Sequence, residues 1–181
     1  LADLLQPGVS AYNVPYMWRL EGQLDADALE QALAHIVERH QPLRARFCWS
    51  GQQPTWSCQP QGPGLTRIDL QQHGDPERQL QALCARWAEQ PFRLEHDLPC
   101  RCVFHHAIFD GWSQRILCQE LSLIYSGHSL PPLEVTYADY CRWIHSEPRS
   151  WHEHDLGYWK GQLAPLPRAE VAPDRPRRSG P

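Results

Sequence analysis

The most constraining feature of this 181-residue chain is the run at residues 104–113, which reads Phe-His-His-Ala-Ile-Phe-Asp-Gly-Trp-Ser. An apolar strand at residues 102–104 leads into the run, and an apolar pattern of helical spacing at residues 116–125 follows it. Because successive strand residues point to opposite faces, His105 and His106 cannot both face one cleft. The run predicts a strand-to-helix turn whose free N–H groups favour developing negative charge, as in acyl transfer.

The same run resembles the His-His-x-x-x-Asp-Gly signature of the condensation domains of nonribosomal peptide synthetases, within the superfamily that includes chloramphenicol acetyltransferase and the dihydrolipoyl acyltransferases. Residues 39–47 resemble the family's Arg-His-x-x-Leu-Arg-x-x-Phe motif, and residues 137–143 resemble its Tyr-x-Asp-Tyr-x-x-Trp motif. The resemblance extends from Ser10 to Pro176, and three motifs in the right order are more specific than one. It implies an α/β fold: a chloramphenicol acetyltransferase-like two-layer α/β sandwich, here as the single N-terminal lobe of a two-lobe domain.

For the complete domain, the resemblance implies an acyltransferase of antibiotic and secondary metabolism. It would form a peptide (amide) bond between an aminoacyl or peptidyl thioester donor and an amine acceptor. Both substrates would arrive on the 4′-phosphopantetheine arms of peptidyl carrier domains and meet in a tunnel between the two lobes, and no intrinsic cofactor is expected. We expect the missing C-terminal lobe to be a partner, the isolated chain to be inactive, and its exposed lobe face to permit dimerisation.

The chain has two expected parts: residues 1–164 form the lobe, and residues 165–181 form a Pro/Arg-rich linker toward the missing C-terminal lobe. A start at Leu1 instead of Met agrees with an excised piece of a longer protein. Between residues 91–94, which resemble the family's Pro-Phe-x-Leu segment, and the histidine pair, a hairpin of roughly 10–15 residues is missing. Either this is a true deletion or the sequence joins across an omitted stretch. We favour the second, because a deletion would expose a strand edge.

The composition is that of an ordinary globular domain, with 41% hydrophobic and 21% charged residues. A formal net charge of −4 argues against a nucleic-acid partner. No apolar run reaches the roughly 20 residues of a membrane span, and no signal-peptide pattern is present, so we expect a cytoplasmic protein. Seven cysteines without a C-x-x-C pair suit free thiols in a reducing compartment. Neither Cys100-x-Cys102 nor the adjacent histidines have the spacing of a zinc site, so no metal is expected.

The two histidines of the run have different expected roles. By resemblance to the family motif, His106 is the catalytic residue, whereas His105 faces the core and supports the active site. A neutral imidazole could act as a general base toward the attacking amine. Because an α-amino group is already partly neutral at pH 7, His106 could instead orient the amine or stabilise the tetrahedral intermediate by hydrogen bonding.

Asp110 is expected to brace the turn from a structural position. In the family this aspartate pairs with an arginine, and Arg44 is the match that we favour over Arg39 and Arg46. A buried bidentate pair would justify both charges, since a buried carboxylate without a partner is costly.

The three residues after Asp110 complete the expected site. Gly111 is assigned a catalytic backbone N–H near the scissile carbonyl, and a purely conformational role is an equal alternative. Trp112 and Ser113 are possible substrate-lining residues.

Hydrophobic periodicity and turn residues predict the element order β-α-β-β-α-β-α-α-α. The expected helices cover residues 25–39, 76–90, 113–126, 137–146 and 150–163, and the expected strands cover residues 12–20, 43–49, 55–58 and 102–104.

Three alternatives to condensation stay open at this point: an epimerization domain, a free-standing coenzyme A acyltransferase, and a non-catalytic carrier-docking module. The sequence Asp-Gly-Trp-Ser followed by Gln114 favours condensation over epimerization. Product formation from carrier-loaded substrates would separate an enzyme from a docking module.

Overall fold

The computed structural model describes residues 8–51, 53–72, 74–101, 103–146 and 149–164. The expected linker at residues 165–181 lies outside the described residues. The chain divides into two compact units, Leu1–Tyr140 and Cys141–Pro181. All the motif residues at positions 39–47 and 104–113 belong to the first unit, which carries the candidate site.

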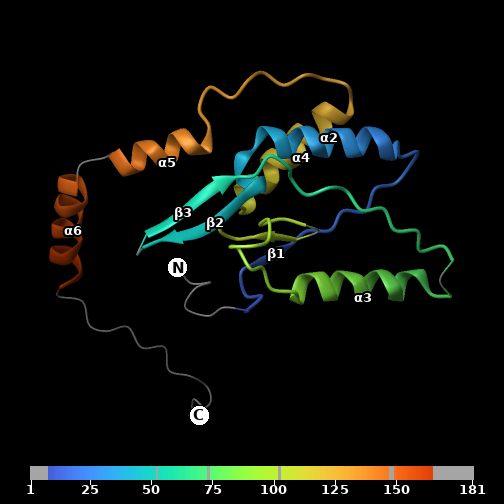
Figure 1. The fold of residues 1–181 in the computed structure, drawn as a ribbon, viewed down its shortest axis with the longest axis horizontal. Coiled ribbons are helices and arrows are strands. Elements are labelled where there is room, and N and C mark those ends of the chain that lie inside the picture. The colour runs from blue at the N-terminus through green and yellow to red at the C-terminus, as the bar shows by residue number, and fades with distance from the viewer. Residues whose placement is uncertain (1–7, 52, 73, 102, 147–148, 165–181) are drawn as a thin grey trace, which may run out of the picture. The chain divides into compact units, whose positions relative to one another are not determined.

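The order of the elements is the one that the sequence predicts, with an added 3₁₀ helix (Figure 1). The elements are β1 (Asn13–Pro15), α2 (Ala26–Arg39), the 3₁₀ helix η1 (Gln41–Arg44), β2 (Ala45–Ser50), β3 (Gln53–Cys58), α3 (Pro76–Glu89), β4 (Val103–His105), α4 (Gly111–Tyr125), α5 (Tyr137–Ser146) and α6 (Arg149–Leu163). The first strand is shorter than the expected residues 12–20. None of the described helices is long and apolar enough to cross a bilayer.

Two antiparallel pairs of strands make up the described β structure. β1 pairs with β4 in a register that places Asn13 opposite His105, and β2 pairs with β3 as a hairpin. Because β1 and β4 are far apart in sequence, their pairing brings the N-terminal segment beside the histidine run. The backbone N–H of His106 continues this contact by donating to the Tyr12 carbonyl at 2.8 Å.

The second edge of β4 is covered, contrary to the edge argument made from the sequence. The segment before β4 folds back on it, so that the His105 N–H donates to the Pro99 carbonyl at 2.8 Å and the Arg101 N–H donates to the Val103 carbonyl at 2.9 Å. A bridge between Cys100 and Phe104 accompanies these bonds. The short connection therefore satisfies the backbone groups that a lost neighbouring strand would expose.

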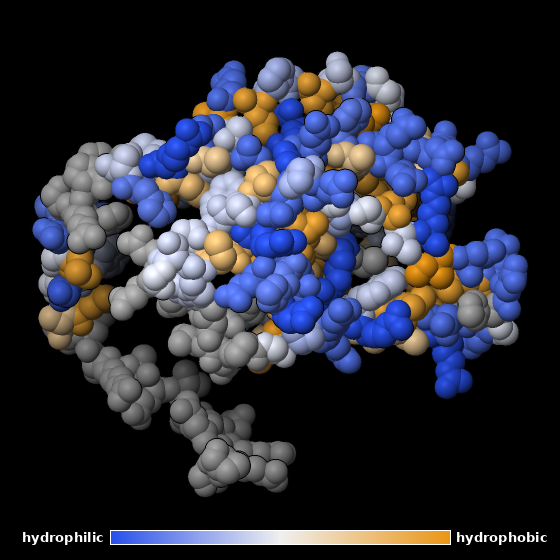
Figure 2. All heavy atoms as spheres, viewed as in Figure 1, coloured by the Kyte–Doolittle hydropathy of each residue, from blue (hydrophilic) through white to orange (hydrophobic). Residues whose placement is uncertain are grey.

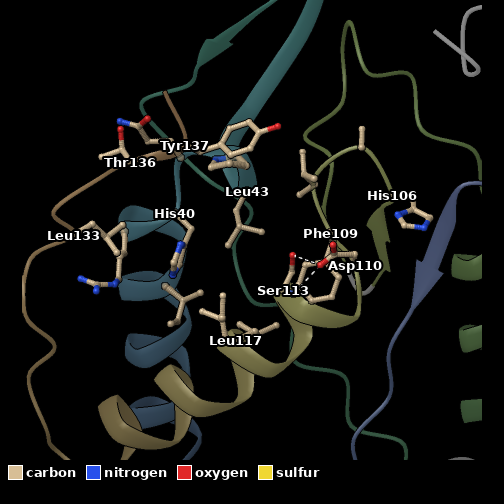
Figure 3. Close-up of a pocket in the computed structure, with 17 residues that line it drawn as sticks. His40, Leu43, His106, Phe109, Asp110, Ser113, Leu117, Leu133, Thr136 and Tyr137 are labelled. Carbon is tan, nitrogen blue, oxygen red and sulfur yellow. Dashed lines mark hydrogen bonds between the residues drawn. The ribbon is translucent and has the colours of Figure 1, made fainter. Parts of the chain in front are cut away.

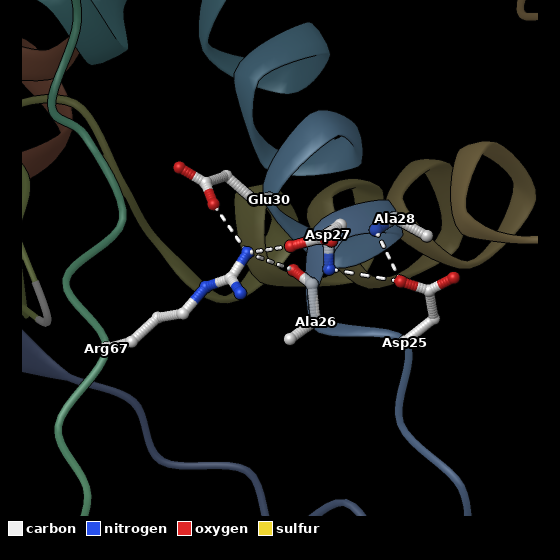
Figure 4. A network of polar contacts seen from close by, with 6 residues as sticks. All are labelled: Asp25, Ala26, Asp27, Ala28, Glu30 and Arg67. Atoms are coloured by element: carbon white, nitrogen blue, oxygen red, sulfur yellow. Dashed lines mark hydrogen bonds and ion pairs between the residues drawn. The ribbon is translucent and has the colours of Figure 1, made fainter.

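Polar contacts fix the first turn of α2, as Figure 4 shows. Asp25 caps the helix, because its carboxylate accepts from the N–H groups of Asp27 at 3.1 Å and Ala28 at 2.9 Å. Arg67 reaches back from the long connection between β3 and α3 to Asp27 and Glu30, each at 2.6 Å. The hydrogen bond that Arg67 donates to Asp27, followed by the one it donates to Glu30, raises the pKa of Arg67. These exposed contacts tie the connection to the first turn of α2.

The core lies between α2, α4 and the histidine run. α2 packs against α4, and the cluster is closed by a stacked pair of rings, Phe104 and Phe109, with centroids 3.9 Å apart. Its buried members are Ile36, Leu43, Cys100, Phe109 and Leu117. Each large apolar side chain buried there contributes about 1.5–3 kcal/mol. The motif turn therefore rests on a packed floor.

Part of the apolar surface stays exposed. On the face shown in Figure 2, hydrophobic residues form separate patches among hydrophilic ones. Large apolar side chains of the first unit with high exposure include Met17 at 72%, Trp112 at 69% and Val135 at 66%. Single exposed residues of this kind are common, but Trp112 lies beside the candidate site.

Candidate functional site

Three segments that are distant in sequence meet at one pocket of about 420 Å³ (Figure 3). They are the end of α2 with η1, the histidine run with the start of α4, and the segment that leads into α5. The lining residues are Ile36, Arg39, His40, Gln41, Pro42, Leu43, His106, Ala107, Ile108, Phe109, Asp110, Ser113, Ile116, Leu117, Leu133, Thr136 and Tyr137. The pocket thus collects residues from all three motifs that the sequence singles out.

His105 points into the protein and not into the pocket. It is only 4% exposed, and its Nδ1 accepts from the Ala107 N–H at 3.1 Å. Its ring also lies near two aromatic rings, with centroid distances of 6.0 Å to Tyr12 and 5.8 Å to Phe92. This position agrees with the face assigned to it from strand alternation, while its supporting role stays a prediction.

His106 lies at the rim of the pocket and is exposed. Its backbone is fixed by the bond to the Tyr12 carbonyl, and its charged form interacts with the nearby Asp110 carboxylate. Figure 3 shows the ring turned away from Leu43 and Leu117, which form the apolar part of the pocket. The imidazole is therefore accessible to a ligand that reaches the rim, and its catalytic role stays a prediction.

Asp110 does not form the predicted ion pair with Arg44. It is exposed and acts as the N-cap of α4, where its Oδ1 accepts from the Ser113 N–H at 2.8 Å and the Ser113 hydroxyl at 2.7 Å. The backbone bond from Ser113, followed by the hydroxyl bond, holds the pKa of Asp110 below its ordinary value. The local cap supplies the donors that the arginine was expected to supply.

Arg44 instead braces the other side of the lobe. Its guanidinium donates to the Gln59 carbonyl at 2.8 Å and to the Glu38 carbonyl at 3.3 Å, so it joins η1 to the end of β3 and to α2. The pairing with Asp110 was wrong because η1 aims this arginine at backbone carbonyls near its own end of the fold. Arg46 also stays apart from Asp110, on β2, where it is exposed.

The ion pair at this site involves Glu120, which sequence reasoning missed. Its carboxylate lies 3.2 Å from Nε of Arg39 and 2.6 Å from Nε2 of His40. The three side chains are 15–26% exposed, and Arg39 also donates to the Pro131 carbonyl at 2.7 Å. The network joins α2, α4 and the segment after α4. An acidic residue within the apolar stripe of α4 was the signal that could have revealed it.

Gly111 is the first residue of α4, and neither its conformation nor its packing demands glycine. It is absent from the glycines with positive φ, and a Cβ at this position would meet nothing within 4 Å. The purely conformational alternative therefore lacks support. The open space over Gly111 is available to an approaching ligand.

Trp112 and Ser113 differ in their relation to the pocket. Ser113 lines it, whereas Trp112 is not among its lining residues and is 69% exposed, with the Arg115 guanidinium 5.6 Å from its ring centroid. Only Ser113 is thus placed to line a substrate in the pocket.

Two further features bear on the chemistry. The Cys100 thiol donates to the Leu43 carbonyl at 3.1 Å, and burial raises its pKa to about 12. Cys102, its predicted neighbour, lies outside the described residues. Among those that are described, no three His, Cys, Asp or Glu residues gather into a group that could hold a metal ion.

Comparison with known proteins gives a consistent result. The family model "Condensation domain" matches residues 1–180. Chondramide synthase CmdD of Chondromyces crocatus is 33% identical over 193 residues, which cover 92% of this chain and 5% of that protein. Phosphinothricin tripeptide synthetase PhsC of Streptomyces viridochromogenes is 32% identical over 203 residues, which cover 97% of this chain and 18% of that protein.

Solved structures share the fold. The first condensation domain of the CDA synthetase has a TM-score of 0.69 at 23% identity, over 92% of this chain and 48% of that one. The complex of the X-domain and OxyB from teicoplanin biosynthesis has a TM-score of 0.73 at 26% identity, over 95% of this chain and 43% of that one. The predicted acetyltransferase-like α/β fold is confirmed, and this chain spans less than half the length of these structures.

The relatives also contain internal residues that this chain lacks. The alignment with the phosphinothricin tripeptide synthetase is 203 positions long, and it includes 97% of the 181 residues of this chain, or about 176 residues. About 27 positions of the alignment therefore have no counterpart in this chain. The sequence predicts a shortfall of this kind before the histidine run, although of only roughly 10–15 residues.

Proposed function

Because the chain belongs to the condensation-domain family of nonribosomal peptide synthetases, we propose that it forms one lobe of a domain that makes amide bonds. The donor is a carrier-bound aminoacyl or peptidyl thioester, and the acceptor is a carrier-bound amine. The observation that carries the proposal is the meeting of three motif segments at one pocket, with an accessible His106 at its rim. Such a protein would act in the cytoplasm with no cofactor of its own, on substrates held by 4′-phosphopantetheine arms.

The reaction needs one bond made and one broken. The acceptor nitrogen attacks the thioester carbonyl carbon, the C–N bond forms, and collapse of the tetrahedral intermediate breaks the C–S bond. The proton lost by nitrogen ends on the released phosphopantetheine thiol. His106 could accept that proton, or hold the amine by a hydrogen bond while it attacks. The two roles share the same geometry.

The start of α4 supports the developing negative charge. Its first N–H groups lie beside the rim, and a backbone N–H at Gly111 with no side chain above it would let the intermediate's oxygen approach closely. Asp110 takes the Ser113 N–H for itself and so fixes the first turn. In this proposal Asp110 positions the donors and does not contact the substrate.

A second lobe is part of the proposal. Carrier-bound substrates need two walls to hold the amine and the thioester in register, and much of the rate advantage of such a reaction comes from that positioning. We therefore expect residues 1–181 alone to show no condensation above background. The donor and acceptor carrier domains and the C-terminal lobe are the expected partners.

A docking function is the second candidate, and one observation favours it. The X-domain that resembles this chain at 26% identity was solved as a complex with OxyB. A lobe with this fold could likewise present a surface to a partner protein without turnover. In that case the lobe forms no amide product, and the imidazole of His106 has no catalytic role.

The test uses the complete condensation domain with loaded carrier domains in a single turnover. His106→Ala should lower the rate of amide formation by roughly 10²-fold or more, the scale of a positioned acid–base or hydrogen-bonding group. His128→Ala, an exposed histidine away from this pocket, is the matched control. Equal rates for the two variants at equal folded fraction would refute the catalytic assignment. If the domain inverts the Cα configuration of the donor and forms no amide bond, it is an epimerization domain. If it accepts a coenzyme A thioester as donor without any carrier domain, it is a free-standing acyltransferase.

A further inference from the structure

We propose that the pocket beside His106 binds one uncharged, apolar amino-acid side chain of a substrate and so selects which residue is joined. The inference rests on the proposed function, because it names the substrate class of the same site. The two possible sources are the acyl residue of the donor and the residue that carries the acceptor amine.

The floor of the pocket is apolar and buried. Four of its lining side chains are nearly inaccessible: Ile36 is 1% exposed, Leu43 8%, Phe109 5% and Leu117 6%. Figure 3 shows Leu43, Phe109 and Leu117 converging on the same space from η1, from the motif turn and from α4. A side chain that enters this space exchanges water for apolar neighbours, which favours aliphatic and aromatic groups.

The rim of the pocket carries the polar groups of the motif. His106 and Asp110 are exposed there, and Ser113 lies between the rim and the floor. The volume of about 420 Å³ is near the lower end of the roughly 300–1,000 Å³ of ligand pockets, so it suits one residue better than a whole peptide. A substrate whose reacting atoms lie near His106 can thus place its own side chain on the floor.

The basic groups that line the pocket from the end of α2 are already paired. Arg39 and His40 both contact the Glu120 carboxylate, and at the rim Ser113 engages Asp110. Asp110 and His106 stand at the exposed rim, so a charged side chain on the floor would have no free opposite charge beside it, and burying an unpaired charge is costly. The pocket should therefore discriminate against acidic and basic residues as well as favour apolar ones.

Two lining residues can be changed without emptying the core. Ile116 on α4 is 37% exposed and Leu133 on the segment after α4 is 36% exposed, and both line the pocket. A larger side chain at either position narrows the pocket from its open side. Leu123, also on α4 and 38% exposed, does not line it and serves as the matched control.

The test measures relative rates for a panel of substrates with the complete domain and its carriers. In one arm the acceptor residue is glycine, alanine, leucine, phenylalanine, aspartate or lysine, and in the other arm the donor is varied in the same way. We expect leucine and phenylalanine to exceed aspartate and lysine by about 10-fold or more in one arm, which identifies the source. Ile116→Phe and Leu133→Phe should each lower the leucine-to-alanine ratio by about 10-fold, and Leu123→Phe should leave it unchanged.

A binding measurement separates this inference from the proposed function. Residues 1–181 are titrated with N-acetylcysteamine thioesters of leucine and of aspartate, followed by chemical shifts or thermal stability. Saturable binding of the leucine probe alone, weakened by Ile116→Phe and not by Leu123→Phe, supports the pocket even if the complete domain makes no amide. Equal binding of both probes, no binding, or a leucine-to-alanine ratio that Ile116→Phe leaves unchanged in both arms would overturn it.

Discussion

Replacing Glu120 with alanine should destabilise the lobe, because this residue joins two basic groups at the end of α2 to α4. Its carboxylate accepts from Arg39 at 3.2 Å and from His40 at 2.6 Å. Removal leaves both donors in a site that is only partly accessible to water. Arg39 keeps one acceptor, the Pro131 carbonyl at 2.7 Å, whereas His40 loses its short contact.

The magnitude follows from these contacts. Hydrogen bonds to charged groups contribute about 1.5–3 kcal/mol each. The side chains keep 15–26% exposure, so water recovers part of the loss, and the remaining bond of Arg39 recovers more. We expect Glu120→Ala to lower the free energy of unfolding by about 1–3 kcal/mol. Glu120→Gln keeps the shape and one acceptor oxygen, so its loss should be smaller.

The assay is urea denaturation of residues 1–181 with each variant. Glu134→Gln removes a charge from an exposed glutamate of the same segment as Pro131, and it should change stability by less than about 0.5 kcal/mol. A cycle of Glu120→Ala, Arg39→Met and the double variant measures the coupling between the two residues. Additive losses in that cycle, or a Glu120→Ala loss no larger than that of Glu134→Gln, would refute the role of the network.

Three other predictions concern charge, reactivity and association. Because hydrogen bonds from Ser113 lower the pKa of Asp110, its carboxylate stabilises the fold above its ordinary pKa of about 4, and this contribution is lost as the pH falls through the lowered pKa. The melting temperatures of the wild type and Asp110→Asn should therefore converge at a pH well below about 4. Persisting separation at that pH would contradict it. Cys48 and Cys58 are exposed and should react with iodoacetamide at pH 8, whereas the buried Cys100, with its pKa raised to about 12, should react only after denaturation, as peptide mass spectrometry would show. Residues 1–181 should self-associate with rising concentration in sedimentation through their exposed apolar surface, and adding a separately made C-terminal lobe should suppress this; a strictly monomeric chain would contradict it.

Features set by neighbours in sequence were predictable from the sequence. The start of α2 follows from Asp25, whose carboxylate caps the helix, and the start of α3 follows from Asp75 and Pro76, which occupy the N-cap and first-turn positions. Pro42 is disfavoured inside a helix, and α2 ends at Arg39, before it. Each of these helix ends is determined by residues within a few positions of it, so the local sequence is enough to predict it.

Features set by distant partners were predictable only in part. The first strand was expected over residues 12–20, yet β1 covers only Asn13–Pro15, where its three residues pair with the three residues of β4. Likewise, the cover on the second edge of β4 comes from backbone bonds that begin at Pro99. Hydrophobic pattern shows that a strand is favoured, but strand length depends on the backbone available to pair with it.

The mistaken pair Asp110–Arg44 shows how the partner of a carboxylate should be chosen. Asp110 stands next to Gly111 at a helix start, where nearby N–H groups satisfy a carboxylate without any arginine. Glu120 stands three residues after the buried Leu117 and just before Leu121, in the middle of a helix whose own N–H groups are already bonded. It has no local donor, so a basic residue from another element must approach it. Residues 39–47 contain three arginines, and an ion pair with one of them should be assigned to the acidic residue that has no hydrogen-bond donor nearby in sequence. The contact of Arg39 with Glu120 follows that rule.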